Sequence, residues 1–190
     1  MPDDARNQWI QDLVSIAPEW FENDPRTPIS LFSIECDRGW AHLIRAILET
    51  GKWRKRQWDD SYKYWSEQSE EDKRKYPTSY ERRKQEFDKT QHQNPFNNIH
   101  IVQVKEKFGG LRFYFSGGDE SFHDFVHAVE HISHYVCEQC GAPGRCRESL
   151  PWVLSLCDTH LTNHLAEMGW TKEDFVESEA RLDEERKDDL

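Results

Sequence analysis

The two motifs that decide the fold are CEQCG at residues 137–141 and CDTH at residues 157–160, with sixteen residues between Cys140 and Cys157. Two ligands that stand two residues apart can turn toward one ion on a tight knuckle, and Gly141 permits the unusual dihedrals that such a turn needs. Three thiolates and one imidazole suit a tetrahedral zinc ion. The sequence therefore predicts one structural zinc ion, bound by Cys137, Cys140, Cys157 and His160.

Downstream of the second motif, apolar residues at helical spacing follow His160, so this pair of ligands is expected on the first turn of a helix. A knuckle, a short hairpin and a helix that carries the last ligands make up the treble-clef arrangement. A unit of some 25 residues buries too little apolar surface to fold alone, and metal binding can contribute on the order of 10 kcal/mol to its order. We expect Trp152, Val153 and Leu154 to pack beside the site.

Upstream of the first motif, two β-rich runs at residues 99–104 and 111–115 flank Gly109–Gly110, which tolerates the positive φ angles of a hairpin turn. A helix is expected over residues 121–136. Its apolar face should cover the hairpin, and the residues of that face are Phe122, Phe125, Val126, Val129, Ile132 and Val136.

The N-terminal part of the chain predicts a first helix that ends at Pro18, a short strand at residues 31–36, and a helix that begins after Asp37 and ends at Gly51. Residues 52–95 differ, because they are crowded with charged and aromatic side chains and contain no Ala, Val, Ile, Leu or Met. We interpret this stretch as a charged helical insertion that leans on the core.

The predicted fold class is α+β: a small antiparallel sheet flanked by helices, with a treble-clef-like zinc module. Residues 1–136 are expected to form the α+β core, interrupted by the insertion at about 52–95. Residues 137–170 would form the zinc module and residues 171–190 an acidic tail.

Composition narrows the class of protein. The chain has 190 residues, of which 32% are charged and 13% aromatic, and this aromatic content is typical of a folded chain rather than a disordered one. No apolar run is long enough to span a membrane, and the first residues lack the apolar stretch of a signal peptide. We expect a cytoplasmic protein whose five cysteines act as thiols or metal ligands rather than as disulfides.

Charge is distributed unevenly along the chain, whose formal net charge is −11. Residues 51–90 carry twelve basic and nine acidic side chains, whereas residues 171–190 carry four basic and nine acidic ones. The acidic total disfavours indiscriminate binding to nucleic acid and suits a basic protein partner.

Two enzyme classes share short motifs with this sequence. The cysteine frame resembles the metal scaffold around HNH nucleases, but residues 141–156 contain no histidine to act as the general base. His127–His131 spells H-x-x-E-H, the signature of inverted zincin proteases, in a chain too short for their further ligand. We therefore expect no enzyme, with an HNH-like nuclease relic as the third choice.

The other histidines near this segment, and the two cysteines outside the metal motifs, do not predict a single function. His123 and His134 extend the H-x-x-E-H stripe opposite the predicted apolar face, and we expect a polar helix face there, with a pH-sensitive contact surface or a second metal site as alternatives. Arginines flank Cys146 and could lower the pKa of its thiol, but we expect an incidental cysteine. Cys36 is expected in the core.

Three stretches carry a resemblance to a known group: CDRGW at residues 36–40, VKEKFGGLRFY at 104–114, and the CEQCGAPG…LCDTH frame. In these stretches the chain resembles a group of uncharacterised small bacterial and phage proteins. The resemblance implies a zinc site and a phage or prophage origin, but no reaction.

The leading functional prediction is a non-enzymatic, zinc-stabilised protein-interaction factor, for which inhibition of a host or defence protein is one use. The alternative is a nucleic-acid-binding zinc protein that uses the basic, aromatic region at residues 52–90. The basic residues of that alternative are Lys52, Arg54, Lys55, Arg56, Arg82, Arg83 and Lys84.

Overall fold

The described residues form two hydrophobic cores, one around a three-stranded sheet and a smaller one in the C-terminal part. Its mixture of helices and small sheets agrees with the predicted α+β class. The computed structural model describes residues 3–21, 27–66, 70–78, 80–82 and 94–188.

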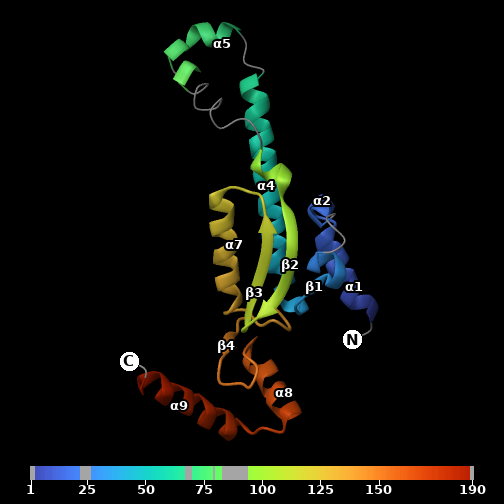
Figure 1. The fold of residues 1–190 in the computed structure, drawn as a ribbon, viewed down its shortest axis with the longest axis vertical. Helices are drawn as coiled ribbons and strands as arrows, with labels where there is room; N and C mark the ends of the chain where they lie inside the picture. Colours follow the sequence, from blue (N-terminus) through green and yellow to red (C-terminus); the bar gives the residue numbers. More distant parts are fainter. Residues whose placement is uncertain (1–2, 22–26, 67–69, 79, 83–93, 189–190) are drawn as a thin grey trace.

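The sheet contains β1 (Ile34–Glu35), β2 (His100–Lys107) and β3 (Gly110–Ser116), in the order β1-β2-β3 (Figure 1). β2 and β3 form the predicted antiparallel hairpin, but β1 is parallel to β2. The prediction of a purely antiparallel sheet is wrong in this respect, because the chain passes from β1 to β2 through a long helical crossover.

The strand expected at residues 31–36 is shorter than predicted. Residues Pro28–Phe32 form the short helix α3, and only Ile34–Glu35 is paired in the sheet. Pro28 lies at the start of α3, where its fixed φ angle and missing N–H favour a helical turn.

The hairpin turn is formed by Phe108 and Gly109 rather than by the two glycines. Both residues have positive φ angles, 52° and 71°, and Gly110 is paired with Lys107 as the first residue of β3. Two successive positive φ angles are typical of the type I′ turn, whose twist matches that of the flanking strands.

The helices α1 (Asp3–Val14), α2 (Pro18–Phe21), α4 (Ala41–Ser66) and α7 (Glu120–Ser133) surround this core. In Figure 1 the strands β2 and β3 lie over α4, with α7 beside β3 and α1 on the side of β1. Apolar side chains from all of these elements meet in the core, and they include Leu13, Trp20, Trp40, Ile47, Val104, Phe113 and Phe122.

The prediction that a helix ends at Gly51 is wrong, because α4 continues to Ser66. A Cβ atom at Gly51 would lie 2.7 Å from the Trp20 ring and 3.0 Å from the Phe122 ring. The glycine is therefore a close-packing site that lets α4 approach α2 and α7, at the ordinary helical cost of glycine. Beyond it, α4 extends away from the sheet toward α5 (Glu70–Lys75), as Figure 1 shows.

The helix α7 covers the hairpin, as predicted, and also protects the free edge of β3. The N–H of Leu111 donates to the Ser133 hydroxyl at 2.8 Å, and the N–H of Phe113 donates to the Glu130 carboxylate at 2.6 Å. These bonds cover backbone donors that an open edge strand would offer to another chain. The inclusion of Ile132 in the buried face is wrong, because its side chain is 48% exposed.

The C-terminal part follows α7 without a break. It contains a knuckle at residues 137–141, a hairpin of β4 (Arg145–Arg147) and β5 (Leu154–Leu156), and the helices α8 (Asp158–Met168) and α9 (Lys172–Asp188). Most of the predicted tail is therefore helical, and its Phe175 is 4% exposed. The second core is made of Cys137, Leu150, Leu156, Leu161, Leu165 and Phe175.

Two short 3-10 helices, η1 (Arg38–Trp40) and η2 (Pro95–Asn98), lead into α4 and β2 respectively. Among the described helices, none combines the length and the apolar character that crossing a membrane requires.

Candidate metal centre

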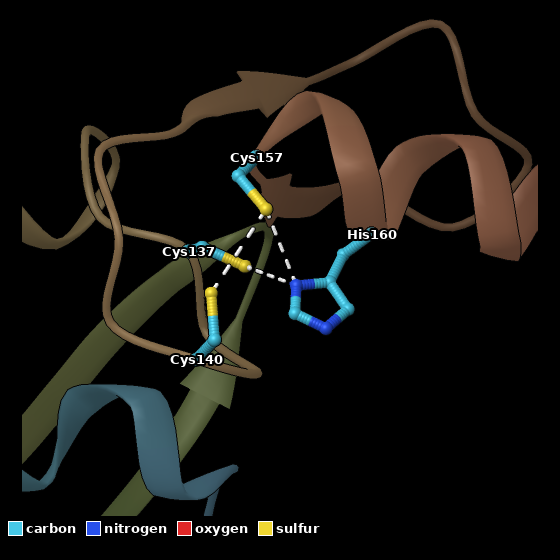
Figure 2. Close-up of side chains that lie close together, drawn as sticks. All are labelled: Cys137, Cys140, Cys157 and His160. Carbon is cyan, nitrogen blue, oxygen red and sulfur yellow. Dashed lines mark hydrogen bonds between the residues drawn. The ribbon is translucent and has the colours of Figure 1, made fainter.

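The four predicted ligands lie close together in the C-terminal part (Figure 2). Their ligand atoms all lie within 4.8 Å of one another. The Cys140 and Cys157 sulfurs are 3.9 Å apart, and Nδ1 of His160 lies 3.4 Å from the Cys137 sulfur and 3.2 Å from the Cys157 sulfur.

These separations can be compared with the edges of a coordination tetrahedron. Bonds of about 2.3 Å to sulfur and about 2.05 Å to nitrogen imply edges of about 3.8 Å between two sulfurs and about 3.6 Å between sulfur and nitrogen. The observed distances lie within about 0.4 Å of these values. The geometry is therefore compatible with a metal site of the Cys3His type.

Each ligand is positioned by a separate local feature. Cys137 is fully buried, and the turn after it is closed by a hydrogen bond from the Gly141 N–H to the Cys137 carbonyl at 2.8 Å. The φ angle of Gly141 is +78°, so the glycine predicted for the knuckle is required by its backbone conformation. Cys157 stands immediately before α8, and His160 lies on its first turn, as the helical spacing predicts.

The thiols of Cys137 and Cys157 differ in pKa because their surroundings differ. Burial raises the pKa of the Cys137 thiol, whereas the nearby backbone N–H of His160 lowers the pKa of Cys157 to about 7. A thiol with a pKa near 7 at the start of a helix is readily converted to the thiolate that binds a metal ion. The predicted ligand Cys140 is exposed, so the cluster lies close to the protein surface.

A second layer of contacts holds the segment that carries Cys157. The Arg147 side chain is only 2% exposed, and its Nε and Nη2 atoms donate to the Leu156 carbonyl at 3.3 and 3.2 Å. The same Nη2 donates to the Asp158 carboxylate at 2.6 Å. Arg147 therefore contacts the residues on both sides of Cys157, in the way that outer contacts orient metal ligands.

The knuckle is also attached directly to the sheet core. The N–H of Gly39 donates to the Glu138 carbonyl at 2.6 Å, and the indole Nε1 of Trp40 donates to the Val136 carbonyl at 2.9 Å. The Glu138 carboxylate accepts a bond from the Asp37 N–H, and burial raises its pKa to about 7. These contacts join segments about one hundred residues apart in sequence.

The β2–β3 turn also contacts the segment between the two cysteine motifs. The Ser155 hydroxyl donates to the Gly109 carbonyl at 2.6 Å, and a Cβ atom at Gly109 would lie 2.9 Å from the Cys146 sulfur. The three stretches that carry the sequence resemblance therefore meet around the knuckle. No periodicity in the sequence predicts this meeting, because it depends on the tertiary fold.

Two expectations for this region differ from the structure: the predicted packing of Trp152 is wrong, and the alternative of a lowered Cys146 pKa is not supported. Trp152 is 68% exposed and does not pack beside the ligands, although Leu154 does pack against the second core. The pKa of Cys146 is raised by burial, because its sulfur lies under the hairpin turn, and the flanking arginines do not lower it.

The H-x-x-E-H segment does not form a metal site in the described structure, where the residues that could hold an ion are the Cys3His group alone. The Glu130 carboxylate is bonded to the backbone of β3. His127 and His131 are exposed, whereas His123 is stacked on Phe115 with ring centroids 4.5 Å apart. The stripe is thus partly a polar face and partly packed against the hairpin.

Three of the seven basic residues predicted for nucleic-acid binding form ion pairs within the molecule. Lys52 pairs with Glu19 at 2.6 Å, and Arg54 pairs with Asp119 at 3.0 Å. Lys55 pairs with Asp59 at 3.2 Å. Arg56 and Arg82 are exposed, and Arg83 and Lys84 lie outside the described residues.

Comparisons with known proteins find no matching protein-family model, no matching curated protein and no matching solved structure.

Proposed function

We propose that the chain is a non-enzymatic interaction protein whose C-terminal part is held together by one structural zinc ion. The observation that supports the metal is the convergence of three cysteines and one histidine at separations that suit tetrahedral zinc. Four protein ligands leave no open position for water or substrate, and this is typical of structural rather than catalytic zinc.

The order of elements around the ligands supports a treble-clef zinc module. A knuckle supplies two cysteines, a two-stranded hairpin follows, and a helix carries the last ligands. The second core contains only six buried side chains, one of which is the ligand Cys137. A core of this size needs the metal for stability, because small units bury too little apolar surface.

The presence of a bound zinc ion is tested with a matched pair of cysteine variants. Cys140 is exposed, so Cys140→Ser removes a ligand without opening a cavity, whereas Cys146→Ser removes a nearby thiol that is not a ligand. The unaltered chain and Cys146→Ser should contain one zinc ion per chain by elemental analysis, and Cys140→Ser should contain much less.

The structural role of the metal is tested by hydrogen exchange. Loss of zinc should remove the protection of α8 and α9, while β2 and β3 stay protected by the larger core. Unchanged protection of α8 in metal-free protein, or a zinc content that does not depend on Cys140, would contradict the proposal.

The proposed partner is a basic protein, and α9 supplies the surface. Residues 171–190 carry nine acidic and four basic side chains, and apart from Phe175 at its first turn the helix is mostly exposed.

Affinity capture from the native host should recover one basic protein in a salt-sensitive manner. Replacing Glu173, Glu177 and Asp183 by their amides should abolish its recovery while zinc content is unchanged. Capture that does not depend on these three carboxylates would contradict the choice of α9.

A further inference from the structure

The hairpin β2–β3 has one face buried against α4 and one face open to solvent. The antiparallel register pairs Val104 with Phe113 on the buried face and Lys105 with Arg112 on the other. In Figure 1 the two strands lie over α4, and none of the helices drawn for the described residues covers the side that faces the viewer. The open face also carries Tyr114, which is 42% exposed.

Charge on this face is opposite in sign to that of the chain as a whole. Residues 91–170 contain only five basic side chains, and three of them, Lys105, Lys107 and Arg112, belong to the open face of the hairpin. Glu106 stands between the two lysines in β2, but it is paired with Leu111 on the opposite side of the pleat, and its carboxylate accepts a hydrogen bond from the Gly109 N–H at 2.7 Å. Glu35 is paired with Lys105 and accepts a hydrogen bond from Gln103 at 2.9 Å. The face is therefore a local cationic surface on an acidic protein.

Aromatic rings accompany these cations. The Lys105 ammonium lies 5.7 Å from the centre of the Tyr114 ring, and the Lys107 ammonium lies 5.2 Å from the centre of the Phe108 ring. Phe108 is 67% exposed, although it stands at a turn position with a φ angle of 52° that favours Asn, Asp or Gly. A large apolar residue that is both strained and exposed suggests a binding role.

We propose that this open face binds single-stranded nucleic acid, with bases stacked on Tyr114 and Phe108 and phosphates contacted by Lys105, Lys107 and Arg112. An aromatic platform flanked by cations is the general mode of single-strand recognition on an open sheet. Four residue steps separate Lys107 from Gln103, the partner of Tyr114, which corresponds to about 13 Å along the strand. A platform of this length accommodates two or three nucleotides.

The face fits this ligand better than the region at residues 52–90 does. In that region Lys52, Arg54 and Lys55 are paired with carboxylates of the same molecule, so binding phosphate would first require those pairs to break. This inference goes beyond the proposed function, since it adds a partner at the open face of the hairpin rather than at α9, and none of the residues that it uses is a predicted metal ligand.

The test uses the zinc-loaded full chain and fluorescein-labelled 12-nucleotide oligo(dT) and oligo(U), with binding followed by fluorescence anisotropy. Binding should weaken with salt, with a log–log slope of about −2 for three phosphate contacts on a single strand. Tyr114→Ala should weaken binding by about 5- to 150-fold, the equivalent of one lost base stack. Lys105→Ala should reduce the slope by about 0.7.

Tyr64→Ala is the matched control, because Tyr64 is a comparably exposed tyrosine on the distal half of α4. It should leave the affinity unchanged. The proposal is overturned if neither oligonucleotide binds at 50 mM salt, if Tyr114→Ala binds as tightly as the unaltered chain, or if Tyr64→Ala weakens binding instead. A labelled poly-glutamate peptide serves as the competing ligand, and its binding in place of both oligonucleotides would assign the face to an acidic protein segment.

Discussion

The attachment of the knuckle to the sheet core should depend on the absence of a side chain at Gly39. A Cβ atom there would lie 2.5 Å from the Glu138 carbonyl carbon and closer still to the carbonyl oxygens of Glu138 and Cys137. These are backbone atoms of the knuckle, so they cannot rotate away. Gly39→Ala must therefore push the two parts of the molecule apart.

The cost of this change can be worked out from the contacts that it disturbs. Overpacking of a tight interior contact costs about 1–3 kcal/mol. The displacement also breaks the Gly39–Glu138 and Trp40–Val136 hydrogen bonds, each worth about 1 kcal/mol. The total is about 4 kcal/mol, which corresponds to a fall in Tm of roughly 8–16 °C for a chain of this size.

Urea unfolding and thermal unfolding of zinc-loaded protein measure the effect, with tryptophan fluorescence as the signal, since Trp40 is fully buried at the junction. The control is Gly169→Ala, because no heavy atom lies within 4 Å of a Cβ atom built there. Placing alanine at its φ angle of +73° should cost only about 1–2 kcal/mol. If Gly39→Ala destabilises no more than this control, the attachment described above does not contribute to stability.

Three further predictions follow from the site and the sheet. Arg147→Lys keeps the charge but loses the contact on both sides of the adjacent ligand, so competition with a chelator should show zinc affinity about 10- to 100-fold lower, and unchanged affinity would refute the positioning role. Glu130→Ala leaves the Phe113 N–H without its partner at the sheet edge, so urea unfolding should show a loss of about 1–3 kcal/mol, and sedimentation should show self-association that the unaltered chain lacks. Burial lowers the pKa of His134 below its ordinary value of 6.5, so the unfolded chain takes up this proton at a higher pH than the folded chain does, and stability must fall as the pH drops below 6.5. His134→Gln should lose less stability between pH 7 and pH 5.5 than the unaltered chain, and equal acid sensitivity would argue against this cause.

Several local features could be predicted because they depend on spacing along the chain. The hairpin, the helix at residues 121–136 and the second pair of ligands at the start of a helix all follow from periodicity and turn chemistry. The errors arose where a tertiary contact overrode a local preference. A glycine after an apolar helical pattern predicts the end of the helix. At Gly51 the helix continues, because the rings of Trp20 and Phe122 occupy the space that a side chain would fill.

The sequence by itself determined which residue types could hold a metal ion, because the two-residue gaps of the cysteine motifs bring ligands together within one turn of backbone. Only the tertiary structure decided which distant segments of the chain pack against those motifs. The bond between the Asp37 N–H and the Glu138 carboxylate joins residues 101 positions apart. The capping of the β3 edge by Glu130 and the cationic open face of the hairpin likewise depend on how elements pack. Such contacts arise from burial and shape complementarity between distant segments, and no short-range pattern in a single chain encodes them.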